Sequence, residues 1–285
     1  MKKIVVGIDG SKESFDSYKC AATLYSDENI ALTSVFVRDE RKTQIPFIYS
    51  GAAYDIAYER LYIPADPQLT KTYEKLNEDN KIFAEKCIKM CENIETGSNI
   101  KKSGIVLKGE PVEELINFSK DFDLLVLGQR GENSAYAREL IGSTSEDLIR
   151  KSLVPVLICP GDNINLDRLL IVYEESKSSE NALNYYLNHL CGMSSELTIL
   201  TKDNSDDIGK SILDKILELK CSNKNIKIKH CKGSLAHCAI DMMEEGSIDA
   251  FILGSHGKHK LAEYLLGSVT VHIIRKSSLP VFIVH

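Results

Sequence analysis

Three features that would place the chain in common functional classes are missing from its 285 residues. Acidic residues outnumber basic ones, 41 to 35, so no overall positive field attracts nucleic acid or acidic membranes. No apolar stretch approaches the ~18 residues of a membrane span, and the run after Met1 is broken at Gly7 and Asp9. The sequence contains neither a Walker-type phosphate-binding loop nor a Ser-His-Asp arrangement of catalytic residues. It therefore shows no motif for fast hydrolysis.

The eight cysteines include no CxxC pair. Without a secretion signal, this pattern predicts reduced, mostly buried thiols and a cytoplasmic location. The stretch "HCKGSLAHC" (230–238) could be taken for a metal site. Its neighbouring residues point to different sides of a strand or helix, and zinc-type spacing is absent, which argues against a metal. Cys87 and Cys91 are spaced to share the buried face of a helix.

Two halves of the chain repeat one pattern. "GQRGENSAYARELIGS" (128–143) is followed by "VPV", and "GSHGKHKLAEYLLGS" (254–268) by "LPV". At the start of each half, "KIVVGIDGS" (3–11) aligns with "RLLIVYEES" (168–176), which sets Asp9 against Glu174. We predict domains at 1–160 and 166–285, with a Tyr- and Pro-rich insertion near 40–75 in the first.

In both halves, short apolar runs alternate with segments whose apolar residues recur at the spacing of a helix. In the first, strands are expected at 3–8, 30–37, 104–109, 123–128 and 154–159, with four helices between them. This order predicts an α/β fold with two repeated, five-stranded, parallel Rossmann-like domains. We further expect a pseudo-two-fold axis, with the last strands, 154–159 and 280–284, lying back to back and covering each other's edges.

The glycine pattern falls where such sheets bind ligands. The strands at 3–8 and 123–128, and their repeats, would flank the point at which strand order reverses. Glycine at a strand end allows positive φ and close approach to a ligand. The later Gly-Ser pair would open a helix whose free N–H groups suit a phosphate. An acidic residue after the first strand would face the ribose, the base or a phosphate-bound metal.

These motifs resemble those of the universal stress protein family, in its tandem two-domain form. The family pattern G-x2-G-x9-G-(S/T) is matched residue for residue at 254–268. The resemblance implies a cytoplasmic stress-response protein that binds an adenine nucleotide of the ATP type, with or without Mg, in a regulatory rather than catalytic way. It also implies antiparallel pairing through the fifth strands and admits a homodimer of the tandem chain. The binding residues that it assigns are Asp9, Val37, Gly128, Arg130, Gly131, Gly142, Ser143, Glu174, Gly254, His256, Gly257, Gly267 and Ser268.

Each half departs from the family pattern in its own way. The first keeps Asp9 but has ten residues between Gly131 and Gly142, one more than the pattern. The second keeps the spacing but has Glu174 in place of the aspartate. We therefore interpret the second half as the better phosphate site and the first as the better nucleoside pocket. "KHK" (258–260) adds cations to the second loop, whereas Glu132 would repel phosphate in the first unless Arg130 offsets it.

Alternatives remain open from the sequence alone. The loop glycines could be plain turn residues, Asp9 could cap the first helix, and His256 could be an ordinary exposed loop residue. The chain could be an interaction scaffold that has lost nucleotide binding, or an adenylylating enzyme, for which no catalytic groups are visible. The insertion, with Tyr49, Tyr54, Tyr58 and Tyr62, could form a lid or a partner surface, or pack over the first domain.

Overall fold

A computed structural model gives the fold. It describes residues 1–25, 28–39, 41, 53–56, 59–62, 67–129, 143–162, 164–202, 225–255 and 266–285, without the side chains of 53–56, 59–62 and 143. The predicted binding residues Arg130, Gly131, Gly142, His256 and Gly257 lie outside these residues. Within the described parts, no helix is both long and apolar enough to cross a membrane.

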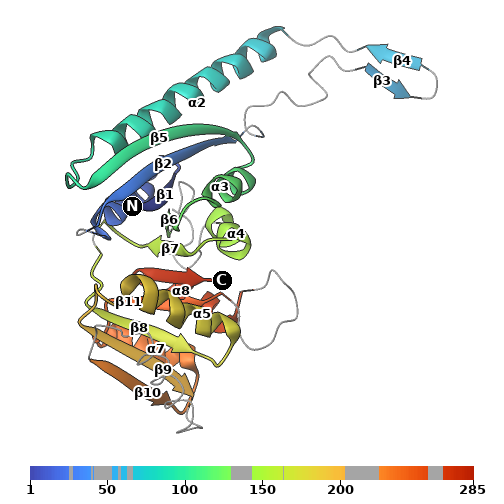
Figure 1. The fold of residues 1–285 in the computed structure, drawn as a ribbon. Helices are drawn as coiled ribbons and strands as arrows, with labels where there is room; N and C mark the ends of the chain where they lie inside the picture. Colours follow the sequence, from blue (N-terminus) through green and yellow to red (C-terminus); the bar gives the residue numbers. More distant parts are fainter. Residues whose placement is uncertain are drawn as a thin grey trace.

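The first half follows the strand and helix order predicted from its periodicity (Figure 1). Its main strands are β1 (Lys2–Ile8), β2 (Ile30–Asp39), β5 (Ile100–Gly109), β6 (Leu124–Gly128) and β7 (Val156–Cys159). Its helices are α1 (Lys12–Thr23), α2 (Pro67–Asn93), α3 (Pro111–Ser119) and α4 (Ser143–Lys151). Pro111 stands at the first position of α3, where its missing N–H breaks no helical hydrogen bond.

The second half repeats this scheme. Its strands are β8 (Arg168–Tyr173), β9 (Glu196–Lys202), β10 (Ile226–Cys231), β11 (Ala250–Gly254) and β12 (Val281–Val284). Its helices are α5 (Lys177–Tyr185), α7 (Leu235–Glu244) and α8 (Ser268–Lys276). A π-helical turn, Tyr186–Leu190, continues α5, and the Cys191 N–H donates to the Tyr186 carbonyl over 2.8 Å.

All ten main strands form one sheet, in the order β10-β9-β8-β11-β12-β7-β6-β1-β2-β5. Among the described strands of this sheet, pairing is parallel within each half, and β12 and β7 pair antiparallel across the junction, with Phe282 opposite Leu157. The predicted fold class is confirmed, and so is the predicted pairing of the last strands. In both halves the strand order reverses between the first strand and the fourth, β1 with β6 and β8 with β11.

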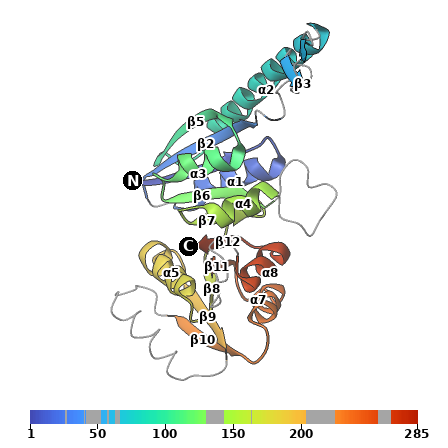
Figure 2. The same ribbon diagram turned by 90° about the vertical axis from the view of Figure 1, so that its right-hand side faces the viewer.

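Helices cover both faces of this sheet, because its strands are apolar on both sides. Alternate residues of β1 show the division: Ile4 and Val6 join the core under α1, α2 and α5, and Val5 joins the core under α3, α4, α7 and α8. Figure 2 shows α5 on one side of the second half's strands and α7 and α8 on the other. The sheet edge above the carboxyl ends of the strands is thus framed by helices.

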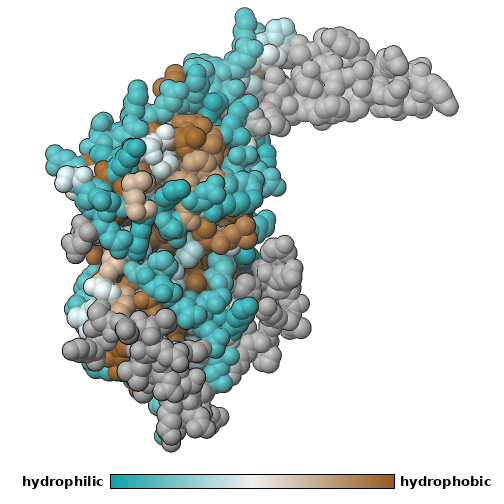
Figure 3. Space-filling view, in the orientation of Figure 1, coloured by the Kyte–Doolittle hydropathy of each residue, from teal (hydrophilic) through white to brown (hydrophobic). Residues whose placement is uncertain are grey.

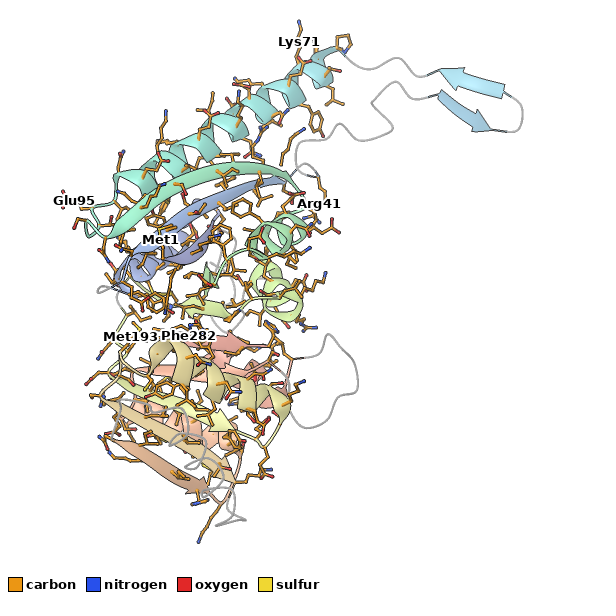
Figure 4. All side chains as sticks on the ribbon, in the orientation of Figure 1. Met1, Arg41, Lys71, Glu95, Met193 and Phe282 are labelled. Atoms are coloured by element: carbon orange, nitrogen blue, oxygen red, sulfur yellow. A yellow bond between two sulfur atoms is a disulfide. The ribbon has the colours of Figure 1, made fainter. Side chains whose placement is uncertain are left out.

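The junction between the halves is packed with buried aromatic side chains. Phe282 of β12 is fully buried, and its ring centroid lies 6.1 Å from that of Tyr185 on α5. Figure 4 shows Phe282 at the boundary between the two halves. Tyr185 also hydrogen-bonds Tyr25, which follows α1 in the first half, and burial raises the pKa of Tyr25 to about 12. The two halves therefore share one continuous core.

The insertion contributes the hairpin β3 (Ala53–Ile56) and β4 (Glu59–Tyr62), together with the start of α2. Figure 1 shows the hairpin beyond the amino end of α2, away from the main sheet rather than over it. Tyr49 and Tyr58 lie outside the described residues, as do the side chains of Tyr54 and Tyr62.

Only the carboxyl-terminal part of α2 contributes buried side chains, at Ala84, Cys87, Ile88 and Cys91. Figure 4 labels Lys71 near one end of the helix and Glu95 just past the other. Toward the amino end, Leu76 is 49% exposed. In Figure 3, hydrophilic residues cover most of the described surface of this face, with a hydrophobic area below the position of α2.

The prediction of reduced cysteines is wrong for most of those described. Cys20 of α1 is bonded to Cys159 of β7, and Cys231 of β10 to Cys238 of α7. Cys191 is also in a disulfide. For Cys20 and Cys159 the cause is tertiary: the strand order brings α1 beside the end of β7 across 139 residues of sequence. Cys87 and Cys91 are buried, as the helical spacing indicated.

Candidate nucleotide-binding edge

The acidic residue and the first glycine of each half lie at the ends of neighbouring strands. Asp9 directly follows β1, and Gly128 ends the adjacent β6. In the second half Glu174 follows β8, and Gly254 ends the adjacent β11. Each pair stands at the carboxyl edge where strand order reverses, the usual ligand position in open α/β sheets. Val37, near the end of β2, is partly buried against the core under α3 and α4.

In the first half, Asp9 holds the cap of α1 but is not the cap itself. Asp9 Oδ1 accepts hydrogen bonds from the Ser11 N–H (2.9 Å) and the Ser11 hydroxyl (2.6 Å). Ser11 Oγ in turn accepts from the Ser14 N–H, which caps the helix. The alternative in which Asp9 caps α1 directly is wrong. Asp9 remains exposed at the strand end, where it can also face a ligand.

In the second half, Ser176 caps α5 in a reciprocal arrangement with Ser179. Glu175, at the position of Gly10, has φ +56°, whereas Gly10 has φ +90°. A side chain in this conformation is uncommon and carries a strain cost. The second half thus keeps the helix cap of the first half, but with a bulkier and more strained turn beside Glu174.

The strand-end glycines are required for close packing rather than for positive φ. Neither Gly128 nor Gly254 has positive φ, so that part of the sequence argument is wrong. A Cβ on Gly128 would lie 3.1 Å from the carbonyl carbon of Glu13 in α1. A Cβ on Gly254 would lie 2.5 Å from the carbonyl carbon of Ser178 in α5. The first helix of each half therefore presses on the end of its fourth strand, more closely in the second half.

A hydroxyl near the start of the last helix ties that helix to the fourth strand in both halves. Thr270 Oγ1 of α8 donates to the Gly254 carbonyl over 2.7 Å. The equivalent Ser145 Oγ of α4 donates to the Gly128 carbonyl over 3.4 Å, at the limit for a hydrogen bond. The sequence analysis missed both residues. The aligned triplets "STS" and "SVT" carried the signal, because both end in a hydroxyl residue.

The start of α8 is arranged as a potential anion site. Gly267 is its N-cap residue and has no side chain with which to cap the helix, and Ser268 is its first residue. The Gly267 N–H donates to the Ser255 carbonyl over 2.9 Å, which joins the two ends of the second loop. The first N–H groups of a helix have no acceptor within the helix, and they carry its positive dipole end. In the first half, Ser143 is the first residue of α4.

A small recess of about 10 Å³, open to solvent, lies at this edge in the second half. Its lining includes Glu174, Ser176, Gly254 and Thr270. This volume holds about one water molecule, whereas small-molecule pockets usually enclose about 300–1,000 Å³. The recess therefore marks a point of contact at the edge, and a nucleotide would lie mostly outside it.

Charge near the edge is mixed. Lys12, in the first turn of α1, pairs with Asp16 over 2.6 Å, and this contact raises the pKa of Lys12. Among the residues that the structure describes, no group of three or more His, Cys, Asp or Glu side chains could hold a metal ion. A magnesium ion there would depend on phosphate oxygens, with the carboxylates of Asp9 or Glu174 as the nearby protein oxygens.

Comparison with known proteins places this arrangement in a family. The model of the universal stress protein family matches residues 1–160 and 210–285. The chain belongs to the universal stress protein family. Universal stress protein Slr1230 of Synechocystis sp. is 26% identical over 290 residues, with 99% of each chain covered. A universal stress protein of Mycolicibacterium smegmatis is 24% identical over 309 residues, covering 99% of this chain and 96% of its own.

A solved structure shares the tandem fold. The universal stress protein of Archaeoglobus fulgidus DSM 4304 superposes with a TM-score of 0.68 at 22% identity, covering 99% of this chain and 97% of its own. Full-length relatives and this fold match establish a tandem universal stress protein.

Proposed function

We propose that this tandem universal stress protein binds an adenine nucleotide of the ATP type, with or without Mg, in one or both halves. Some members of the family bind nucleotides. The observation that carries the proposal is the uncapped start of α8, which Thr270 fixes beside Gly254 and next to Glu174. Phosphate oxygens would accept from the free N–H groups of α8, and an acidic residue after the first strand would face the sugar or base.

The two halves support different parts of a nucleotide. The second half has the small recess beside Glu174 and the family's loop spacing. The first half has Asp9 beside Gly10, without the bulk and strain that Glu175 brings to the second. We propose Gly128, Arg130, Gly131, Gly142 and Ser143 as the phosphate side of the first half, with Asp9 and Val37 on its nucleoside side. Gly254, His256, Gly257, Gly267 and Ser268 would form the phosphate side of the second, beside Glu174.

Nucleotide occupancy would act as a signal rather than feed a reaction. The sequence offers no paired acid and base and no nucleophile motif, so any ATP hydrolysis is expected to be slow. We place the protein in the cytoplasm, which is typical of the family. Family members often dimerise. Because β7 and β12 already cover each other's edges within the chain, a homodimer would need another surface.

A second candidate function is an interaction scaffold that no longer binds nucleotide. The close contact of Gly254 with Ser178 and the strained Glu175 favour it, because both reduce the room near Glu174. The scaffold would use the surface of α2, where Leu76 is 49% exposed, to bind a protein partner.

Native mass spectrometry of the purified chain, with and without added ATP, separates these functions. One nucleotide per chain is expected. The Gly267→Val variant should lose the nucleotide held by the second half, because a β-branched side chain would crowd the start of α8. Its backbone, at φ −61°, accepts valine, so the variant should fold. Gly233→Val is the control, since nothing lies within 4 Å of a Cβ there.

Each count of nucleotides has a distinct meaning. Two per chain would contradict the division between the halves. A nucleotide that survives Gly267→Val would assign binding to the first half. If no nucleotide is bound, and titration with ATP also shows no binding, the proposal of nucleotide binding is overturned and the scaffold is supported.

A further inference from the structure

One side chain at the first half's edge reaches into the second half. Gln129 directly follows Gly128, and its own N–H donates to the Cys159 carbonyl over 3.2 Å. Its side-chain amide donates to two carbonyls at the carboxyl end of α8, Ile274 at 3.1 Å and Ser277 at 2.9 Å. The last carbonyls of a helix have no intrahelical donor, so Gln129 supplies the partners they lack.

A second contact joins the same end of α8 to the first half. Arg275, in the last turn of α8, lies 4.0 Å from Glu146 in the first turn of α4, and Glu146 also pairs with Arg150. Gln129 stands just before the first half's loop, 130–142, and Glu146 just after it. The flanks of that loop thus both hold the carboxyl end of α8.

The other end of α8 belongs to the second half's edge. Thr270 binds the Gly254 carbonyl, and Gly267 binds the Ser255 carbonyl. The helix has nine residues, so it spans about 13 Å and connects the two edges as one short rigid element.

The residues that form this connection differ between the two halves. Ser255 is the equivalent of Gln129, and its N–H donates to the Val284 carbonyl as that of Gln129 does to Cys159. A serine side chain is too short to span the distance that the glutamine side chain spans. Val271 stands where α4 has Glu146, so this position of the second half carries no charge.

We propose that Gln129 is a positioning residue that couples the two halves: ligand at the carboxyl edge of one half changes the affinity of the other half's edge through α8. The proposal rests on the nucleotide binding proposed above. Coupling between two sites is reciprocal and commonly amounts to a factor of about 5–150 in affinity. Loss of the two amide hydrogen bonds removes most of this factor, while the hydrogen bonds from Thr270 to the Gly254 carbonyl and from Ser145 to the Gly128 carbonyl remain.

Hydrogen exchange on the full chain tests the coupling, with ATP as the probe and native mass spectrometry to count bound nucleotide. Two peptides are followed, 124–129 of β6 and 270–278 of α8. In the unmodified chain, ATP should slow exchange in both by about fivefold or more. In Gln129→Glu, which keeps the shape but loses the donors, ATP should slow only the peptide of the half that holds it, with less than about twofold change in the other.

Gln129→Ala should behave as Gln129→Glu does, which separates lost donors from added charge. Asn181→Ala is the matched control, since it removes one amide hydrogen bond of 2.8 Å, to the His285 carbonyl, without touching α8. It should keep the two-sided response. If Gln129 only stabilises the fold, its variants would be less stable, but ATP would still slow exchange in both peptides. That result would overturn the proposal. So would a one-sided response in the unmodified chain, with nucleotide binding still intact. No bound nucleotide at all would remove the proposed function, and this inference with it.

Discussion

Gly254 at the end of β11 lies against Ser178 of α5 so closely that a Cβ would stand 2.5 Å from the Ser178 carbonyl carbon. The matching contact in the first half is looser, since a Cβ on Gly128 would stand 3.1 Å from the carbonyl carbon of Glu13. Backbone atoms cannot move aside as the end of a flexible side chain can. The second half therefore depends more strongly on its glycine.

This difference predicts unequal costs for one substitution. Gly254→Ala should lower the free energy of unfolding by about 1–3 kcal/mol, the usual range for overpacking. Gly128→Ala should cost less than about 1 kcal/mol, because a shift of a few tenths of an ångström relieves the contact. Urea denaturation of both variants measures the difference. Equal costs would show that the two helix–strand contacts are equally tolerant.

The hydroxyl that ties α8 to β11 should also contribute to stability. Thr270 is 5% exposed, and its hydroxyl lies 2.7 Å from the Gly254 carbonyl. Thr270→Val keeps the shape and removes the donor, so we expect a loss of about 1–2 kcal/mol in the free energy of unfolding. Ser145→Ala is the matched control in the first half, where the distance of 3.4 Å predicts a change within about 0.5 kcal/mol. A larger loss for Ser145→Ala than for Thr270→Val would contradict this ranking.

The sequence predicted those features that depend on local pattern and on the repeat. The apolar run that follows Asp123 forms the fully buried strand Leu124–Gly128, and the last strands pair antiparallel with each other, as the resemblance to the family implied. The alignment of Asp9 with Glu174 correctly placed both after the first strand of a half.

Other features depend on contacts between distant segments and could not be read from the sequence. The closeness of Gly254 to Ser178, the reach of Gln129 to α8 and the pairing of Cys20 with Cys159 all require the folded sheet. The prediction of the residue that caps α1 was wrong for a different reason. "DGS" holds two residues that can cap a helix, and only the backbone path decides that Ser11 does so while Asp9 supports it.

The disulfide between Cys20 and Cys159 should stabilise the first half. It joins residues 139 apart in sequence, and a cross-link of this kind restricts the unfolded chain. Reduction, or replacement of both residues by serine, should lower the free energy of unfolding by about 2–4 kcal/mol. Urea denaturation with and without a reductant measures the loss. The double-serine variant should respond less to the reductant than the unmodified chain does.

Alkylation under non-reducing denaturing conditions, followed by peptide mass analysis, provides the control for that prediction. Cys91, which is in no disulfide, should be labelled, whereas Cys20 and Cys159 should not. Full labelling of Cys20 and Cys159 would show that the purified protein holds them as thiols.

The ion pair between Arg168 and Asp249 predicts a specific loss of stability in acid. Arg168 Nη2 lies 2.7 Å from Asp249 Oδ1, and Arg168 Nε and the Arg168 N–H each lie 3.0 Å from Oδ2. The hydrogen bond from the Arg168 guanidinium, helped by that of its N–H, lowers the pKa of Asp249 in spite of its burial. A lowered pKa in the folded state means that the stabilisation is complete above the unfolded-state value, about pH 4, and is lost as the pH falls through the folded-state pKa.

Asp249→Asn should therefore reduce the free energy of unfolding at neutral pH. Its difference from the unmodified chain should shrink as the pH falls below about 4, because the carboxyl of Asp249 binds a proton in the unfolded chain before it does so in the folded chain. Urea denaturation at several pH values measures this difference. Arg168→Gln breaks the same contact, so its loss and that of Asp249→Asn should not add in the double variant. A difference that stays constant down to pH 3 would show that Arg168 does not hold Asp249 in its ionised form.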